Sequence, residues 1–127
     1  MSNWLFPISP VAASRPRVSR HGAYFAGPYK TFRTEMADLV PTVLGDFEPV
    51  VCPLAVSLEF FIKQPKQTKL AAPKADIDNY IKSVLDSLNG FIWEDDFQIW
   101  SVYAIKQWAP KGEDGYFTVE ISECSII

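Results

Sequence analysis

Residues 54–62 read Leu54-Ala-Val-Ser-Leu-Glu-Phe-Phe-Ile62 and lie near the middle of a chain of 127 residues. Large apolar side chains stand at every second position of this segment, from Leu54 to Ile62, with Ala, Ser, Glu and Phe between them. Because successive side chains of a strand point to opposite faces, the alternation predicts a strand that buries one face. Such a strand needs neighbours in a sheet and a layer that packs on its apolar face.

Two helices are predicted, one on each side of this strand in the sequence. The first covers about residues 28–40: Pro28 suits the first helical turn, and Pro41 is expected to end the helix. The second covers about residues 78–89, with Gly90 just past its end. The apolar side chains of each helix fall on one face, as packing against a sheet requires. They are Tyr29, Phe32, Met36, Leu39 and Val40 in the first helix, and Tyr80, Ile81, Val84, Leu85 and Leu88 in the second.

Three further strands are predicted. Trp4–Ile8 comes first and is followed by a loop or arm over residues 9–27, which are rich in Pro, Ser, Arg and Gly. Phe97–Trp108 and Tyr116–Ser122 alternate again, and the turn at Gly112–Gly115 between them favours a hairpin.

The order of these elements is strand, helix, strand, helix, strand, strand. It predicts a small single domain over residues 1–127, of α/β (α+β) class, with a mixed sheet of about four strands and two main helices. Asp96 is expected to return to the start of the second helix. The link between the strands at 54–62 and 97–108 is therefore not expected to be a plain parallel crossover, and the strand order stays open.

Composition favours a soluble globular protein, with 48% hydrophobic and 21% charged residues. No stretch approaches the ~20 consecutive apolar residues of a membrane helix. Pro7 and Pro10 interrupt the apolar start of the chain and no Lys or Arg precedes it, which argues against a secretory signal. Cys52 and Cys124 stand far apart and are expected as reduced thiols. These features predict a cytoplasmic protein without a membrane partner.

Charge is unevenly distributed along the chain, although the total is only −3. Residues 1–75 carry nine bases and five acids, whereas residues 76–127 carry three bases and ten acids. A chain segregated in this way can bind a polyanion through one surface and keep its acids for another purpose, unless the basic stretches are simply solvated loops. The bases in acid-free stretches are Arg15, Arg17, Arg20, Lys30 and Arg33, followed by Lys63, Lys66, Lys69 and Lys74.

The acidic residues suggest a metal site at the start of the second helix. Asp76 and Asp78 are two residues apart, so in an extended segment their carboxylates point the same way. Lys82 and Asp86 follow at helical spacing on the same flank as Asp78. A third acidic group, residues 94–96, can return to this point from the far end of the helix. Converging carboxylates are the oxygen ligands that Mg²⁺ prefers, and a nearby lysine can hold a phosphate.

A structural interpretation of the same residues stays open. An aspartate at a helix start often caps the backbone amides, and Asp78 with Lys82 can form an ordinary surface ion pair worth ~0.2–0.5 kcal/mol. Hydrolysis by a side-chain nucleophile has little support, because the single histidine, His21, lies in the arm.

Two segments carry a specific motif. They are Lys74-Ala-Asp76-Ile-Asp78-Asn79-Tyr-Ile-Lys82-Ser-Val-Leu-Asp86-Ser-Leu88 and Trp93-Glu-Asp95-Asp96-Phe-Gln98-Ile99. Together they resemble the RusA family of Holliday-junction resolvases, whose pattern is D-apolar-D-N-x-x-K-x-x-x-D-x-L followed by an aromatic residue and a D-D pair. The arginine-rich arm, with Tyr24 and residues 29–33, is similar to phage-type members. The resemblance covers about residues 15–35 and 74–99 and continues more loosely through the final strands.

The resemblance implies a homodimeric endonuclease, often encoded by prophages, that resolves four-way DNA junctions by paired symmetric cuts in recombination and repair. It implies Mg²⁺ as the cofactor, with Mn²⁺ able to take its place. Asp76, Asp78 and Asp96 would be the catalytic metal ligands and Lys82 the essential lysine. Asp95 matches the first acid of the pair, and Asn79 and Asp86 match positions that support the helix start or the lysine.

The basic residues are the expected DNA contacts, with one departure from the family. Family members can carry a run of arginines directly before the first aspartate, whereas this chain has Leu70-Ala-Ala-Pro-Lys74. DNA contact in that stretch is therefore expected to be weaker or to shift toward the arm, and the preference for junctions stays open. The expected DNA-binding residues are Arg15, Arg17, Arg20, Lys30, Arg33, Lys69 and Lys74.

A homodimer suits a substrate that must be cut symmetrically, because a two-fold axis provides two equivalent sites. The chain has four Trp, five Tyr and nine Phe residues, which can line an interface or fill the core. Two other functions stay open: a DNA-binding protein without catalysis, and a nuclease that prefers flaps or other branched DNA.

Overall fold

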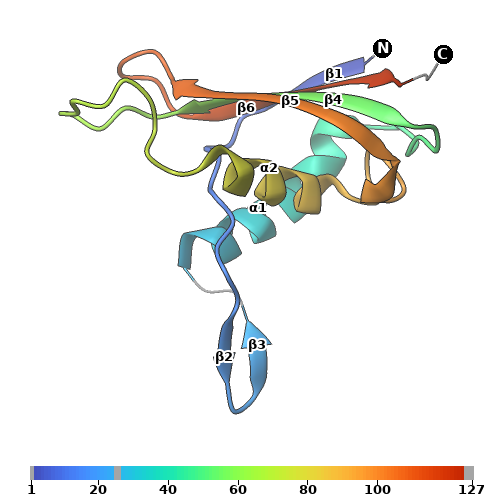
Figure 1. Ribbon diagram of the computed structural model, residues 1–127, viewed down its shortest axis with the longest axis horizontal. Coiled ribbons are helices and arrows are strands. Elements are labelled where there is room, and N and C mark those ends of the chain that lie inside the picture. The colour runs from blue at the N-terminus through green and yellow to red at the C-terminus, as the bar shows by residue number, and fades with distance from the viewer. Residues whose placement is uncertain (1, 25–26, 125–127) are drawn as a thin grey trace.

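The computed structural model describes residues 2–24 and 27–124 and confirms the α+β class, with two helices on a mixed four-stranded sheet (Figure 1). The strands of this sheet are β1 (Ser2–Phe6), β4 (Leu54–Ile62), β5 (Ile99–Trp108) and β6 (Tyr116–Glu123). The helices are α1 (Gly27–Leu44) and α2 (Ile77–Leu88), and a short 3₁₀ turn, η1 (Asp96–Gln98), leads into β5. A separate hairpin consists of β2 (Arg17–Ser19) and β3 (Gly22–Tyr24).

The strand order, β1-β6-β4-β5, corrects two predictions. The expected hairpin between the last two strands is wrong, because β6 lies between β1 and β4 and does not pair with β5. β4 and β5 are parallel neighbours joined through α2, so this link is a β-α-β crossover after all. Gly115 allows β6 to start close to β4, since a Cβ there would meet the Phe61 carbonyl oxygen at 2.9 Å.

The core lies between the sheet and the two helices, which cover the same face of the sheet (Figure 1). The alternation in β4 is confirmed: Leu54, Val56, Leu58 and Phe60 are all buried. The buried side chains of the other elements that face this core include Phe117, Val119 and Ile121 of β6, Tyr29, Phe32, Met36 and Val40 of α1, and Tyr80, Val84 and Leu88 of α2. The apolar faces predicted for both helices are therefore the faces that build the core.

Pro41 does not end the first helix, contrary to the prediction. α1 continues to Leu44 with Pro41 inside it, and Gly45 follows with a φ of 59°. A proline in a helix interior costs ~3 kcal/mol because it removes a hydrogen bond and crowds the preceding turn. Here Val43 and Leu44 pack against the core. Both side chains are only partly buried, so their packing offsets part of that cost.

The arm is not a plain loop, because β2 and β3 form an antiparallel hairpin within it. The hairpin projects away from the sheet and helices (Figure 1). The turn is stabilised locally: the Ser19 hydroxyl accepts a hydrogen bond from the His21 N–H at 3.1 Å, and Gly22 has a φ of 112°. At the base of the arm, the Ala13 N–H donates to the Asn79 carbonyl at 2.9 Å. This bond ties the arm to the first turn of α2.

Other element boundaries shift by a few residues. β1 covers Ser2–Phe6 instead of Trp4–Ile8, because Pro7 has no N–H to donate to a neighbouring strand. β5 begins at Ile99 instead of Phe97, because residues 96–98 form η1. α2 ends at Leu88, and Gly90 follows with the positive φ of 85° expected for a residue just past a helix. Cys52 and Cys124 are free thiols.

Candidate active site

Asp76 and Asp78 lie at the start of α2, and neither carboxylate caps the helix within the described residues. Asp76 is the N-cap residue, in extended conformation, but its side chain makes no capping hydrogen bond. Its backbone carbonyl instead accepts bonds from the N–H groups of Asn79 at 3.1 Å and Tyr80 at 3.4 Å. Both aspartates are exposed, and neither carboxylate has a hydrogen bond or ion pair with any residue in the described ranges. The cap interpretation therefore lacks the bond it requires.

Lys82 pairs with Asp86 rather than with Asp78. The Lys82 Nζ lies 3.4 Å from a carboxylate oxygen of Asp86, and the lysine side chain is 66% exposed. An exposed pair four residues apart on a helix contributes only ~0.3–0.5 kcal/mol. The pair is too weak to fix the ammonium group, so Lys82 is available to an incoming anion.

Asp96 lies at the start of η1, where Trp93 holds its carboxylate. The indole Nε1 of the buried Trp93 donates to Asp96 Oδ1 at 2.7 Å. Burial raises the pKa of Asp96, and the charges of Asp86 and Asp95 raise it further, whereas the Trp93 bond and Lys82 lower it. The charges of Asp86 and Lys82 act on the pKa of Asp96, so the segment that carries Asp96 returns toward this pair on α2.

Two residues to which the sequence assigned no role, Gln98 and Lys106, hold the backbone at Asp95 and next to Asp76. Gln98 is buried: its Oε1 accepts a bond from the Asp95 N–H at 2.8 Å, and its Nε2 donates to the carbonyls of Val50 and Cys52. Lys106 on β5 donates to the Ala75 carbonyl at 2.6 Å, directly before Asp76. In the sequence, Lys106 falls in an alternating series with Val102, Ala104 and Trp108, and a lysine in such an apolar series was the available signal.

We expect Asp96→Asn to raise the melting temperature at neutral pH. Because folding raises the pKa of Asp96, the folded state favours the protonated carboxyl, and the ionised form costs stability above that pKa. The cost disappears as the pH falls through the raised pKa, so the two proteins should converge in stability at acid pH. An asparagine oxygen can still accept the Trp93 bond. Thermal unfolding of both proteins from pH 4 to pH 8 measures this, and a gap that is constant across the pH range would contradict it.

The predicted DNA contacts are spread over the arm, α1 and the loop before α2. Arg33 is the exception to their exposure, because its guanidinium donates to the Tyr29 hydroxyl at 3.1 Å and lies 5.8 Å from that ring's centre. Arg17 belongs to β2, but its side chain lies outside the described part of the structure. The exposed cations of the predicted set are Arg15, Arg20, Lys30, Lys69 and Lys74.

The donor set at the start of α2 fits Mg²⁺ by its chemistry. Asp76 and Asp78 offer carboxylate oxygens without other partners in the described residues, and the charge of Lys82 acts on a third carboxylate, that of Asp96. Hard oxygen donors of this kind are those that Mg²⁺ binds together with water and phosphate. Within residues 2–24 and 27–124, however, no three His, Cys, Asp or Glu side chains are close enough together to hold a metal ion.

Carboxylates, a lysine and an adjacent basic arm are the groups with which hydrolases of phosphodiester bonds work, and the class they define is a nuclease. The family model described as Endodeoxyribonuclease RusA matches residues 7–121. The chain therefore belongs to the RusA endodeoxyribonuclease family, as its motif predicted. No curated protein matches the chain. No helix in the described residues is both long and apolar enough to cross a membrane.

Proposed function

We propose that this protein is a Mg²⁺-dependent endodeoxyribonuclease that resolves four-way DNA junctions by paired symmetric cuts. The observation that carries the proposal is the pair of exposed carboxylates, Asp76 and Asp78, which have no partner in the described residues although they stand at a helix start. Membership of the RusA endodeoxyribonuclease family supports DNA as the substrate. Within the described residues, neither carboxylate makes a hydrogen bond or ion pair that would explain its place.

Asp76 and Asp78 would hold the metal and Asp96 would join them, although within the described residues the three carboxylates are not gathered closely enough to hold it together. The metal, when bound, would polarise the scissile phosphate and lower the pKa of a bound water, and Mn²⁺ can take its place. Lys82 would hold a non-bridging phosphate oxygen, because its exposed ammonium is only weakly bound by Asp86. Trp93 keeps one oxygen of Asp96 in a fixed orientation. Lys106 fixes the backbone just before Asp76.

A homodimer supplies the second cut, since a two-fold axis places two equivalent sites on a symmetric junction. β5 forms one edge of the sheet and carries exposed apolar side chains, among them Trp100, Tyr103 and Ile105. An apolar sheet edge of this length favours association with another chain. The protein is proposed to act in the cytoplasm of a bacterial or phage-infected cell.

Simultaneous replacement of Arg15, Arg17 and Arg20 by Ala should flatten the salt dependence of DNA binding. Each phosphate that a protein neutralises contributes about −0.9 to the slope of log affinity against log salt. Loss of up to three contacts should therefore reduce the slope by about 2–3. Fluorescence anisotropy of a labelled junction from 50 to 300 mM salt, without divalent metal, measures the slope. Lys111→Ala, an exposed cation on the turn before β6, is the control. An unchanged slope in the triple variant would show that the arm does not contact DNA.

A panel of substrates tests the proposed specificity. Four-way junctions, flaps, forks and duplex of matched length are incubated with Mg²⁺, and the cut positions are mapped on every strand. The proposal expects junctions to be cut fastest, at two symmetric positions. Faster cleavage of flaps would favour the alternative nuclease, and binding without any cleavage would favour a non-catalytic DNA-binding protein.

A further inference from the structure

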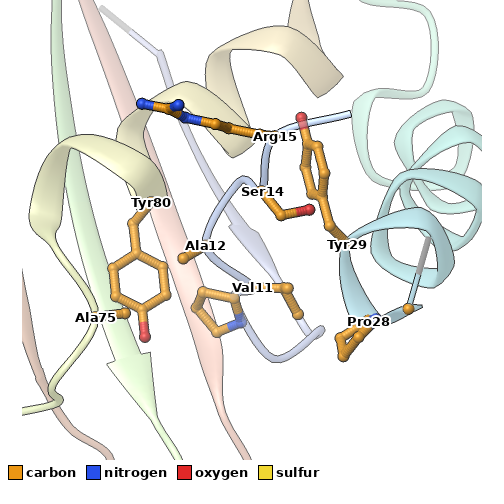
Figure 2. Close-up of a pocket in the computed structure, with 10 residues that line it drawn as sticks. Val11, Ala12, Ser14, Arg15, Pro28, Tyr29, Ala75 and Tyr80 are labelled. Atoms are coloured by element: carbon orange, nitrogen blue, oxygen red, sulfur yellow. The ribbon is translucent and has the colours of Figure 1, made fainter. Parts of the chain in front are cut away.

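A cavity of about 650 Å³ lies between the base of the arm and the starts of both helices (Figure 2). Residues 10–15 of the arm form one wall, residues 27–29 of α1 a second, and Ala75 and Tyr80 a third. The volume is within the range of ~300–1,000 Å³ typical of small-ligand pockets. The cavity is therefore large enough for a nucleotide.

Tyr80 brings an unused hydroxyl to this cavity. Tyr80 is only 6% exposed, and its ring stacks on that of Phe60 with 5.4 Å between the ring centres. The hydroxyl has no hydrogen-bond partner among residues 2–24 and 27–124, although Tyr80 lines the cavity. A tyrosine hydroxyl can both donate and accept a hydrogen bond. Solvent reaches this hydroxyl, because the only buried side-chain oxygen or nitrogen without a partner in the described residues is Ser83 Oγ, so the Tyr80 hydroxyl is open to a bound molecule.

The rim of the cavity favours an anionic group. The exposed Arg15 belongs to the lining, and Figure 2 shows its side chain on the same side as the Tyr29 hydroxyl. The first turn of α1 also borders the cavity and contains no acidic residue. Figure 2 shows the Arg15 guanidinium pointing away from the start of α1, so the arginine by itself is the group on the rim that can bind a phosphate. Part of the remaining lining, which includes Val11, Ala12 and Pro28, is apolar and suits the flat face of a base (Figure 2).

The position of the cavity links it to the candidate active site. Ala75, in its wall, is the residue before Asp76, and Tyr80 follows Asp78 by two residues on α2. The Ala13–Asn79 bond holds the arm wall against the same turn of the helix. Tyr80 and Asp78 lie on different faces of α2, so Ala75 is the link: a DNA strand with its scissile phosphate at Asp76 would pass an adjacent nucleotide along this wall of the cavity.

We propose that this cavity binds one unpaired nucleotide that flanks the scissile phosphate. The inference rests on the proposed nuclease function. The phosphate of that nucleotide would contact Arg15, while the base would enter between the apolar walls and bond to the Tyr80 hydroxyl. A base inside a duplex is stacked and paired and must be extruded at a cost of a few kcal/mol. A branch point offers unpaired bases at less cost, so the cavity selects branched DNA over duplex.

Ser14→Trp and Tyr80→Phe test this proposal. The exposed Ser14 lines the cavity, so a tryptophan there should fill it without entering the core, and Tyr80→Phe removes only the hydroxyl. Ser122→Trp, on an exposed position of β6 opposite Ala55, is the control. Binding to a four-way junction and to duplex is measured without divalent metal. The junction is intact or carries an abasic site at either nucleotide flanking the mapped cut.

Wild-type protein should lose at least about fivefold in affinity when one flanking base is removed, a factor typical of one stacked base. Ser14→Trp should lose a similar factor on the intact junction and nothing further on the abasic one. Tyr80→Phe should show a smaller loss that also depends on that base. In both variants the preference for junction over duplex should fall, whereas Ser122→Trp should match the wild type.

Three results would overturn the proposal. Wild-type affinity could be insensitive to both abasic sites, or Ser14→Trp could lose the same factor on intact and abasic junctions. In either case junction cleavage by wild-type protein would leave the proposed function standing. If wild-type protein neither binds nor cuts branched DNA, the proposed function and the cavity proposal fail together.

Discussion

Lys82→Ala should reduce single-turnover cleavage of a four-way junction by about 100-fold or more, with almost no change in melting temperature. The expected loss follows from removal of a cation that stabilises the charge developing on the phosphate, a contribution of several kcal/mol to the transition state. The stability of the protein should hardly change, because the exposed pair with Asp86 contributes only ~0.3–0.5 kcal/mol. Cleavage rate and thermal unfolding are measured on one preparation.

Two further variants separate charge from geometry at this position. Lys82→Arg keeps the positive charge but replaces a compact ammonium by a broad planar fork, so partial recovery of the rate is expected. Asp86→Ala removes the partner of Lys82 and should cost far less activity than Lys82→Ala. If Lys82→Ala loses activity only in proportion to lost folded protein, the lysine is structural and has no place in the catalytic site.

Asp76→Asn and Asp78→Asn should each abolish cleavage, by about 100-fold or more, while junction binding is kept or becomes tighter. Carboxylates bind the metal but repel phosphate, so their neutralisation removes catalysis without weakening the contact with DNA. Little stability is at risk, since neither carboxylate has a partner among the described residues.

Asp114→Asn is the matched control for these two changes. It removes one exposed carboxylate, paired with Lys63 at 3.6 Å, on the turn before β6. Cleavage with Mg²⁺ and binding in EDTA are compared across the three variants. Near-wild-type turnover of Asp76→Asn or Asp78→Asn would remove that residue from the site.

The elements that could be predicted are those whose periodicity is local. Strand β4 and both helical faces follow from side-chain spacing, because one buried face leaves a pattern along its own segment. The strand order could not be predicted in this way, because the position of β6 between β1 and β4 depends on packing between segments that are far apart in the sequence. The end of α1 was predicted wrongly for the same reason. The local rule ends the helix at Pro41, but Val43 and Leu44 pack against the core and the helix continues to Leu44.

The candidate site shows the same difference between features set by local spacing and features set by long-range contacts. The spacing of Asp76 and Asp78 predicted two carboxylates at the start of a helix, and that is where they lie. The pKa of Asp96 is set first by burial and then by the Trp93 bond, and both depend on how the segment before β5 folds onto α2. The pairing of Lys82 with Asp86 instead of Asp78 depends on side-chain conformations that helical spacing leaves equally accessible.

Cleavage of a synthetic four-way junction in Mg²⁺, compared with EDTA, tests the central claim most directly. The strands are labelled one at a time, and Asp78→Asn serves as the inactive reference. The proposed function predicts two symmetric cuts across the junction in Mg²⁺, none in EDTA, and none with Asp78→Asn in either condition. Tight binding of the junction with no metal-dependent cut, or equal cleavage by Asp78→Asn and wild-type protein, would contradict it.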